Sequence, residues 1–374
     1  MIANLLLGII AVLLCLFIKD KKKGLKWAFF IITLFLSVRY GWGNDYMSYL
    51  DSFREYSQEG FKLFDIEQSG DLRRGNEYGW VILNRLFGYL GVGFFGFVIV
   101  LTIFENWTVH RMVAKYVDPK YYWAAIFVFV FSTSFCVNAS MLRQYLCMCI
   151  YLLVVDLMVE KKYKWYLILS IALIFLATTI HRSSVMLFAT LPLFYIHVDN
   201  TKASRIWMTL IAVLFVAWSV YGRVLIEPMM LNILEGNEDY SEYIQYIGQN
   251  SSGLSETGLG VIFRYIMFGT WLLLLPNIDK NQQPIIILGI ASYFLEIVGD
   301  IAPIAGRLQL YFSCMDLLRW AWLLTIAKKT PIVYGLFIAE TMIIVKCFFE
   351  FFYNPTWIRA YLHFHTIFEA GEWM

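Results

Sequence analysis

The sequence predicts an all-α integral membrane protein with about 12 transmembrane helices, because charged stretches divide it into apolar runs near the length of about 20 residues that a helix needs to cross lipid. Hydrophobic residues make up 60% of the 374 residues, charged residues make up 16%, and the mean hydropathy is +0.62. Since lipid offers the backbone no hydrogen-bonding partner, the runs that cross it should be helical.

The apolar runs give the expected order of helices along the chain. They cover residues 2–18, 25–38, 91–109, 121–137, 143–158, 163–180, 183–198, 206–222, 260–276, 284–299, 308–327 and 331–349. Residues 1–374 are expected to form one polytopic membrane domain. We expect an outer loop over 39–78 with an interfacial helix over 79–90, a second outer loop over 223–259 and an outer tail over 350–374.

Lysine positions predict the orientation of these helices. The first apolar run is followed, not preceded, by basic residues, so we expect a retained helix whose N-terminus lies outside. With that orientation, 14 of the 16 lysines fall in or beside the inner loops. Cytoplasmic loops carry such an excess, and both termini are therefore expected outside.

Arginines are distributed differently from lysines. Most lie on or near the predicted outer side, namely Arg39, Arg54, Arg73, Arg74, Arg85, Arg143, Arg182, Arg223, Arg264, Arg307 and Arg359. A guanidinium group binds phosphate or carboxylate through two hydrogen bonds, so this distribution predicts an outward-facing anion site. The alternative is pairing with acidic residues of loop 39–78, which we favour for Arg54, Arg73 and Arg74.

The candidate anion-binding residues are those that adjoin apolar helices without an evident acidic neighbour in the sequence. Arg143 and Arg307 are the first choices, followed by Arg39 and Arg264. Gln144 adds hydrogen-bond donors beside Arg143, in the first turns of an expected helix where the dipole also favours an anion.

Three residues are candidates for a general base. Asp45 is the first choice, and His181 and Glu77 follow; a carboxylate near lipid has its pKa raised by desolvation, and the ordinary pKa of histidine lies near neutral pH. A helix cap or an arginine partner is the alternative for each carboxylate, and a simple hydrogen bond is the alternative for His181. The sequence does not decide among them.

Some polar groups have structural explanations. Asp316 with Arg319, and Lys346 with Glu350, have the spacing of ion pairs along a helix. Another polar group, Glu296, Asp300 and Arg307, surrounds a Gly/Pro-containing break near the outer surface. Breaks of this kind often hold ligands.

Aromatic residues indicate a sugar-binding surface, and the absence of known motifs argues against a cofactor or a metal site. Trp42, Tyr46 and Tyr49 in the first outer loop are expected to stack on sugar rings. The six cysteines include no C-x-x-C pair, and the sequence has no P-loop, no G-x-G-x-x-G and no H-E-x-x-H motif. We therefore expect no cofactor and no metal site, although a divalent ion held by Asp45 or Asp300 stays open as an alternative.

Five short segments resemble the EpsG-like polysaccharide polymerases, which are related to the Wzy-type O-antigen polymerases. These segments are RYGWGNDYMSY, NEYGWVILNRLF, NASMLRQYL, HRSSVMLF and GRLQLYF, in that order between residues 39 and 312. The resemblance implies a glycosyltransferase in the bacterial cytoplasmic membrane, involved in O-antigen or exopolysaccharide biosynthesis. It would join oligosaccharide repeat units linked to polyprenyl (undecaprenyl) pyrophosphate on the outer face.

The resemblance also implies binding partners, and two other functions remain as alternatives. The partners would be the lipid-linked donor and acceptor, the bilayer, and the flippase and chain-length regulator of the same pathway, with no nucleic acid. The rival functions are a lipid-linked oligosaccharide flippase or transporter, and a polytopic acyltransferase that modifies surface glycans. The sugars, the linkage, the anomeric outcome and the oligomeric state do not follow from the sequence.

Overall fold

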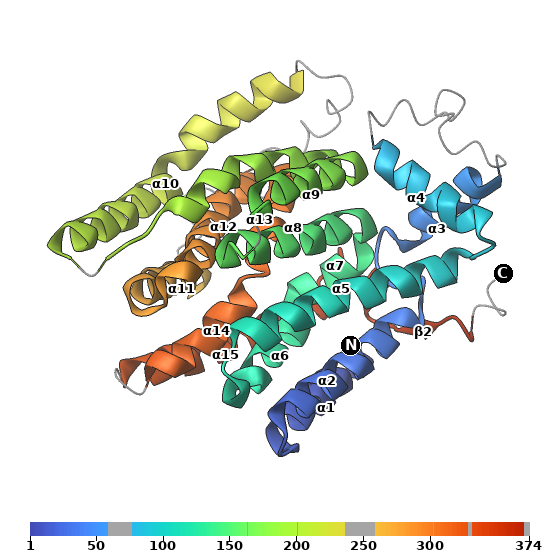
Figure 1. Cartoon of the computed structure of the whole chain (residues 1–374), viewed down its shortest axis with the longest axis horizontal. Helices are drawn as coiled ribbons and strands as arrows, with labels where there is room; N and C mark the ends of the chain where they lie inside the picture. Colours follow the sequence, from blue (N-terminus) through green and yellow to red (C-terminus); the bar gives the residue numbers. More distant parts are fainter. Residues whose placement is uncertain are drawn as a thin grey trace. The chain divides into compact units, whose positions relative to one another are not determined.

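A computed structural model describes residues 1–58, 77–162, 164–199, 201–235, 259–301, 303–327 and 331–369 of the chain. The fold is all-α apart from one small two-stranded sheet, as far as these residues show (Figure 1). The chain divides into two compact units, which are Met1–Ala189 with Thr341–Met374, and Thr190–Glu340. The predicted all-α class is confirmed.

Unit 1 is a bundle of helices of different lengths. Its elements are α1 (Ile2–Phe17), α2 (Lys21–Ser37), β1 (Arg39–Tyr40), α3 (Tyr46–Gln58), α4 (Tyr78–Tyr89), α5 (Phe94–Tyr116), α6 (Tyr122–Phe131), α7 (Thr133–Ser140), α8 (Leu142–Glu160), α9 (Tyr166–Ile180), α16 (Ile358–Tyr361) and β2 (His365–Thr366). Helix α5 packs on α2 and α8, and α8 packs on α9. Helix α4 lies against both α3 and α9.

Unit 2 is built around α12 (Gln283–Ile301). That helix contacts α10 (Lys202–Glu235), α11 (Leu259–Leu274) and α13 (Pro303–Ser313). The unit also contains α14 (Asp316–Ala327), which contacts α11, and the short 3-10 helices η5 (Leu275–Asn277) and η6 (Lys280–Gln282). The 3-10 helix η3 (Arg182–Tyr195) and α15 (Ile332–Tyr353) each continue from one unit into the other.

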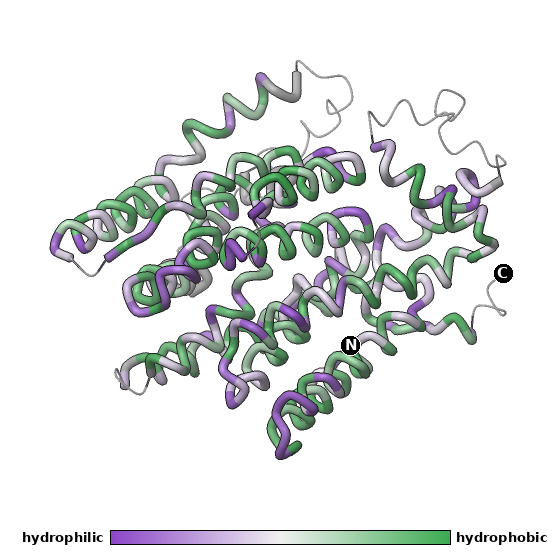
Figure 2. The backbone as a smooth tube through the Cα atoms, viewed as in Figure 1, coloured by the Kyte–Doolittle hydropathy of each residue, from purple (hydrophilic) through white to green (hydrophobic). Residues whose placement is uncertain are grey.

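The apolar helices agree with a membrane protein. Among the described residues, four helices are long and apolar enough to cross a bilayer, or five if the bent pair α6 and α7 forms one span. Apolar residues run along these helices, with polar residues gathered at many of their ends (Figure 2). The number of about 12 spans stays a prediction, since several apolar helices are short, such as the 16 residues of α1.

Several predicted helices differ from the structure at a break. The run 121–137 is divided into α6 and α7, which meet at an angle of 59°. The run 308–327 is interrupted by a turn between α13 and α14. The run 183–198 is largely the 3-10 helix η3, which contains Pro192, a residue without the N–H that a regular helix uses. Apolar composition alone does not reveal such breaks.

The loops also contain more helix than expected. Loop 39–78 includes α3, and the expected interfacial helix 79–90 is α4, within one residue at each end. The expected second outer loop, 223–259, begins within α10, which extends to residue 235. Residues 236–258 of this loop lie outside the described part. The predicted tail 350–374 begins within α15 and is described as far as residue 369.

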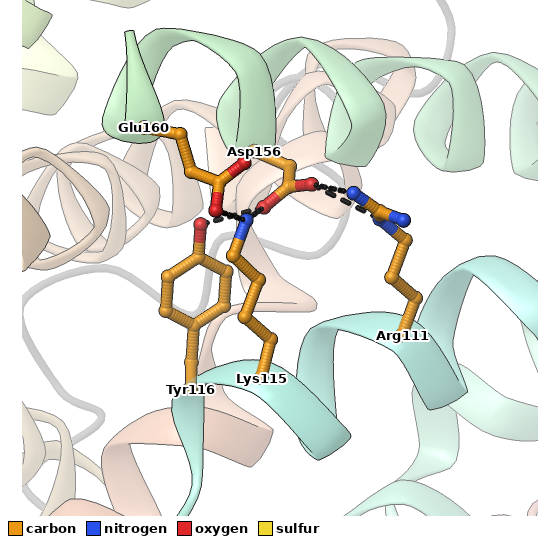
Figure 3. A network of polar contacts seen from close by, with 5 residues as sticks. All are labelled: Arg111, Lys115, Tyr116, Asp156 and Glu160. Atoms are coloured by element: carbon orange, nitrogen blue, oxygen red, sulfur yellow. Dashed lines mark hydrogen bonds and ion pairs between the residues drawn. The ribbon is translucent and has the colours of Figure 1, made fainter. Parts of the chain in front are cut away.

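An ion-pair network joins the lysine-bearing ends of α5 and α8 (Figure 3). The Asp156 carboxylate accepts hydrogen bonds from Arg111 Nη2 at 2.6 Å and from Tyr116 Oη at 2.7 Å, and it also pairs with Lys115. Lys115 Nζ lies 2.7 Å from Glu160 Oε1. Helix α8 therefore has Asp156 in its last turns and Arg143 in its first, about 20 Å apart along the helix at 1.5 Å per residue.

Candidate functional site

Glu77 brings together three segments at the opposite end of unit 1 from the Asp156 network. Its Oε1 atom lies 2.8 Å from His181 Nδ1 and accepts a hydrogen bond from the backbone N–H of Arg182 at 3.2 Å. Its Oε2 atom forms an ion pair with Arg143 Nη1. The side chains of Glu77, Arg143 and His181 are 13%, 23% and 17% exposed. Three residues that the sequence singled out separately thus form one half-buried cluster.

Helix ends hold these three side chains in place. Glu77 directly precedes α4, Arg143 lies in the first turn of α8, and His181 directly follows α9. Gly79 allows α4 to approach α9 closely, since a Cβ atom there would lie 2.3 Å from Thr179 Oγ1. A larger residue at position 79 would push α4 away, and Glu77 with it, from His181.

The environment of Glu77 keeps its carboxylate ionised. Burial by itself would raise the pKa of Glu77, but the hydrogen bond with His181, the charge of Arg143 and the Arg182 N–H outweigh it, so the pKa is lowered. An ionised carboxylate can only accept hydrogen bonds. We therefore assign the proton of neutral His181 to Nδ1, which leaves Nε2 as the basic nitrogen.

Acidification should remove stability at this end of unit 1. Because the folded-state pKa of Glu77 lies below its ordinary value of 4.5, the carboxylate stabilises the fold above that pH, and this contribution is lost as the pH falls through the lower folded-state value. We expect the thermal midpoint, followed by tryptophan fluorescence in detergent, to fall less steeply in Glu77→Gln than in the wild type between about pH 5 and pH 3. Equal slopes in the two proteins would exclude Glu77 as the source.

Tyr49 and Asp45 extend this cluster along α3. The Arg143 guanidinium carbon lies 5.5 Å from the centre of the Tyr49 ring, within the range of a cation–π contact. The backbone N–H of Asp45 donates to Ser140 Oγ at 3.1 Å, and Asp45 begins the turn that leads to Tyr49. Since Ser140 precedes Arg143 by three residues, Asp45 lies at the same end of unit 1 as the cluster. We call Asp45, Tyr49, Glu77, Arg143 and His181 the outer-end site, after the side of the membrane on which the lysine distribution predicts it to lie.

Two predicted sugar-stacking residues lie in the core of unit 1. Trp42 and Tyr46 are each 0% exposed. Trp42 Nε1 donates to the carbonyl oxygen of Tyr361 at 3.2 Å, and the Tyr46 hydroxyl donates to the carbonyl oxygen of Arg39 at 3.0 Å. These rings have no exposed face for a sugar, so of the three aromatics only Tyr49 belongs to the outer-end site.

Arg39 is also an interior residue, with 1% exposure. Its Nη1 atom donates to Thr102 Oγ1 at 3.0 Å and to the Leu36 carbonyl oxygen. Glu105 of α5 lies in the same bundle and is close enough to interact electrostatically with Arg39, although the sequence neighbours of Arg39 do not reveal it. Gln144 is buried as well, at 4% exposure, although it adjoins Arg143 in the sequence.

Unit 2 contains the other two candidate arginines. Arg264 Nε lies 3.1 Å from Glu296 Oε1, so Arg264 too has an acidic partner that its sequence neighbours do not reveal. Arg307 is exposed on α13. The side chain of Asp300 lies outside the described residues. Phosphate binding by Arg264 or Arg307 remains a proposal from the sequence.

The two ion pairs assigned to structure from helical spacing are confirmed. Arg319 Nε lies 3.1 Å from Asp316 Oδ1, and Lys346 Nζ lies 3.2 Å from Glu350 Oε1. Arg319 has a second partner that sequence reasoning missed, since its Nη1 atom lies 2.9 Å from both carboxylate oxygens of Glu340. No group of three or more metal-ligating side chains occurs within the described ranges.

Comparison with known proteins identifies one family. The family model described as the EpsG family matches residues 5–363, nearly the whole chain. No curated protein and no solved structure matches the sequence.

Proposed function

Since the chain belongs to the EpsG family of polysaccharide polymerases, we propose that it is a membrane glycosyltransferase that joins oligosaccharide repeat units linked to polyprenyl pyrophosphate. The observation that carries this proposal is the contact of Glu77 with both His181 and Arg143. It supports the proposal because a candidate base, a residue that can orient that base and a cation lie within one cluster, and the proposed reaction needs all three.

The proposed step is a displacement at an anomeric carbon. The hydroxyl oxygen of the acceptor sugar forms a bond with the anomeric carbon of the donor, and its proton passes to His181 Nε2. The bond from that carbon to the pyrophosphate oxygen breaks, and its electron pair leaves with the polyprenyl pyrophosphate. Glu77 holds the imidazole through Nδ1 and stabilises the imidazolium ion that forms.

Arg143 is proposed to stabilise the leaving pyrophosphate. Its guanidinium group is held between the Glu77 carboxylate and the Tyr49 ring, so it is oriented before the substrate binds. Fixed donors of this kind are effective where negative charge develops in the transition state. Protonation of His181 adds a second positive charge beside the pyrophosphate.

Asp45 and Tyr49 are proposed to bind the acceptor sugar. The two residues lie one turn apart at the start of α3, where a carboxylate can accept hydrogen bonds from sugar hydroxyls and a ring edge can contact the sugar. The structure of this cluster favours His181 over Asp45 as the base, because only the imidazole has a carboxylate to orient it among the contacts of the outer-end site.

The outer face of the bacterial cytoplasmic membrane is the proposed location. Two observations support it: the lysines of unit 1 gather at helix ends such as that of α5, and the outer-end site lies at the opposite ends of the same helices. Both termini would then face outward. A flippase that delivers the repeat units and a chain-length regulator are the proposed partners.

An elongation assay tests the proposal. Purified protein in liposomes, given only lipid-pyrophosphate repeat units of the producing strain, should release polyprenyl pyrophosphate and form a ladder of longer glycans on a gel. Translocation of the repeat unit without lengthening would instead support a transporter. Absence of a ladder with verified substrate would contradict the polymerase assignment.

A further inference from the structure

Helix α4 has a buried tryptophan one turn after Glu77. Trp80 is 3% exposed, and its backbone N–H donates to the carbonyl oxygen of Glu77 at 3.1 Å. The two residues lie within one helical turn, so a displacement of α4 moves both of them. The proposed reaction uses Glu77 but leaves Trp80 without a role.

The ring of Trp80 contacts the ring of Tyr49, which belongs to α3. The two centroids lie 5.5 Å apart and the planes meet at 65°, the edge-to-face arrangement that aromatic pairs favour. Trp80 also lies 5.4 Å from Phe97 of α5, between centroids. Since the Arg143 guanidinium carbon lies 5.5 Å from the centre of the Tyr49 ring, Tyr49 contacts both Trp80 and Arg143.

These contacts form a closed ring that includes Arg143. The Arg143 guanidinium group pairs with the Glu77 carboxylate and also contacts the Tyr49 ring. Trp80 joins these two partners, through the backbone to Glu77 and through its side chain to Tyr49. Fixing a long side chain costs conformational entropy, so a guanidinium group that two partners already hold loses less when the substrate binds.

Glycines of α4 keep Trp80 close to Tyr49. A Cβ atom at Gly88 would lie 2.6 Å from Ser57 Cβ of α3, and one at Gly79 would lie 2.3 Å from Thr179 Oγ1 of α9. Helix α4 is therefore confined between α3 and α9, and the ring of contacts is closely determined.

We infer that Trp80 is a positioning residue, which supports the Tyr49 ring and thereby holds the Arg143 guanidinium group toward the leaving pyrophosphate. The inference rests on the proposed function, in which Arg143 stabilises that pyrophosphate. Trp80 itself touches no reacting atom. An apolar residue of the expected interfacial helix thus has a role in the reaction that helical spacing alone does not indicate.

Kinetics of Trp80→Leu test this role. Leucine keeps an apolar side chain in the core but removes the aromatic contact with Tyr49, so the maximal elongation rate should fall about three- to tenfold, the range expected for one aromatic pair. The half-saturating concentration of the repeat unit should change little, because Arg143 acts mainly in the transition state. Trp80→Phe keeps an aromatic ring and should recover most of the lost rate.

The matched control is Phe87→Leu. Phe87 lies two turns after Trp80 on the same helix, and its ring contacts the same Phe97, at 4.9 Å between centroids. The substitution therefore weakens the packing of α4 on α5 at a distance from Tyr49. Phe87→Leu should elongate glycans at the wild-type rate per folded protein.

A double mutant separates positioning from mere stabilisation. In an Arg143→Lys background, Trp80→Leu should lower the maximal rate no further, because the guanidinium group that it positions is already absent. A purely structural role would reduce the rate by the same factor in both backgrounds. That outcome, or a normal maximal rate in Trp80→Leu, would overturn the inference.

NMR of the Arg143 side chain gives a readout that does not depend on polymerase activity. In protein with isotopically labelled arginine, the Arg143 Nε–H resonance is identified by its loss in Arg143→Lys. The ring current of Tyr49 displaces this resonance, so it should move in Trp80→Leu toward its position in Tyr49→Leu and stay in place in Phe87→Leu. An unmoved resonance in Trp80→Leu would refute the link between Trp80 and Arg143. The expected movement, in a protein whose wild type forms no glycan ladder, would show that the link is present and that the proposed function has failed.

Discussion

Replacing His181 with glutamine should lower the initial rate of glycan elongation by about a hundred- to ten-thousandfold, the contribution typical of a general base. Glutamine fills a similar volume, and its amide N–H can still donate to Glu77, so the half-buried ion pair between Glu77 and Arg143 keeps its surroundings. An amide cannot accept a proton at neutral pH, however. The loss should therefore appear in the maximal rate, with the apparent affinity for the repeat unit nearly unchanged.

The matched control for this substitution is Arg182→Gln. Arg182 is the next residue in the chain and its side chain is exposed, whereas its contribution to the site is the backbone N–H that reaches Glu77. Glutamine keeps that N–H, so elongation in Arg182→Gln should stay near the wild-type rate. Rates would be measured as polyprenyl pyrophosphate released per folded protein. A His181→Gln protein with normal stability and a normal rate would exclude the imidazole as the base.

The sequence predicted the members of the outer-end site better than their arrangement. Glu77, Arg143 and His181 stand out because each is an ionisable residue at the predicted outer end of an apolar run. Their mutual contact depends on how α4 packs against α9, and this packing requires Gly79 beside Thr179. No local periodicity specifies a contact across 104 residues, so Glu77 and His181 appeared as alternatives when they are in fact hydrogen-bonded.

Ion pairs show the same limit in unit 2. The contact of Arg319 with Asp316 follows from a spacing of three residues along one helix, which the sequence reveals directly. Glu340 reaches Arg319 from α15, and only the placement of that helix brings it there. The pairing of Arg264 with Glu296 likewise joins two helices. Judging an arginine as unpaired from its sequence neighbours was therefore unsafe.

Aromatic residues in loop 39–78 show a second reason why the sequence did not predict the whole site. Trp42 and Tyr46 are surrounded by polar and small residues in the sequence, which is typical of an exposed surface. They are buried because the C-terminal segment, with Tyr361 and Phe364, packs over Trp42, while Phe94 of α5 packs on Tyr46. Such coverage comes from segments far along the chain, so composition within the loop could not predict it.

Arg143→Lys should reduce elongation by about a hundred- to a thousandfold, the cost typical of losing one oriented donor to a developing oxyanion. Lysine keeps the positive charge that pairs with Glu77, so the fold should be retained. It lacks the planar fork with which a guanidinium group can hold Glu77 and a phosphate oxygen at once, and it loses the contact of the guanidinium group with the Tyr49 ring.

The control for this prediction makes the same substitution at Arg54 of α3. The Arg54 side chain is 53% exposed and, among the described residues, pairs with Asp51 at the surface at 3.8 Å, so Arg54→Lys should elongate glycans at the wild-type rate. Because the anion contact would matter most in the transition state, the decrease in Arg143→Lys should be larger in the maximal rate than in the half-saturating concentration. Equal activity of the two lysine variants would mean that charge alone is sufficient at position 143, and the proposed two-point contact with the leaving pyrophosphate would then have to be abandoned.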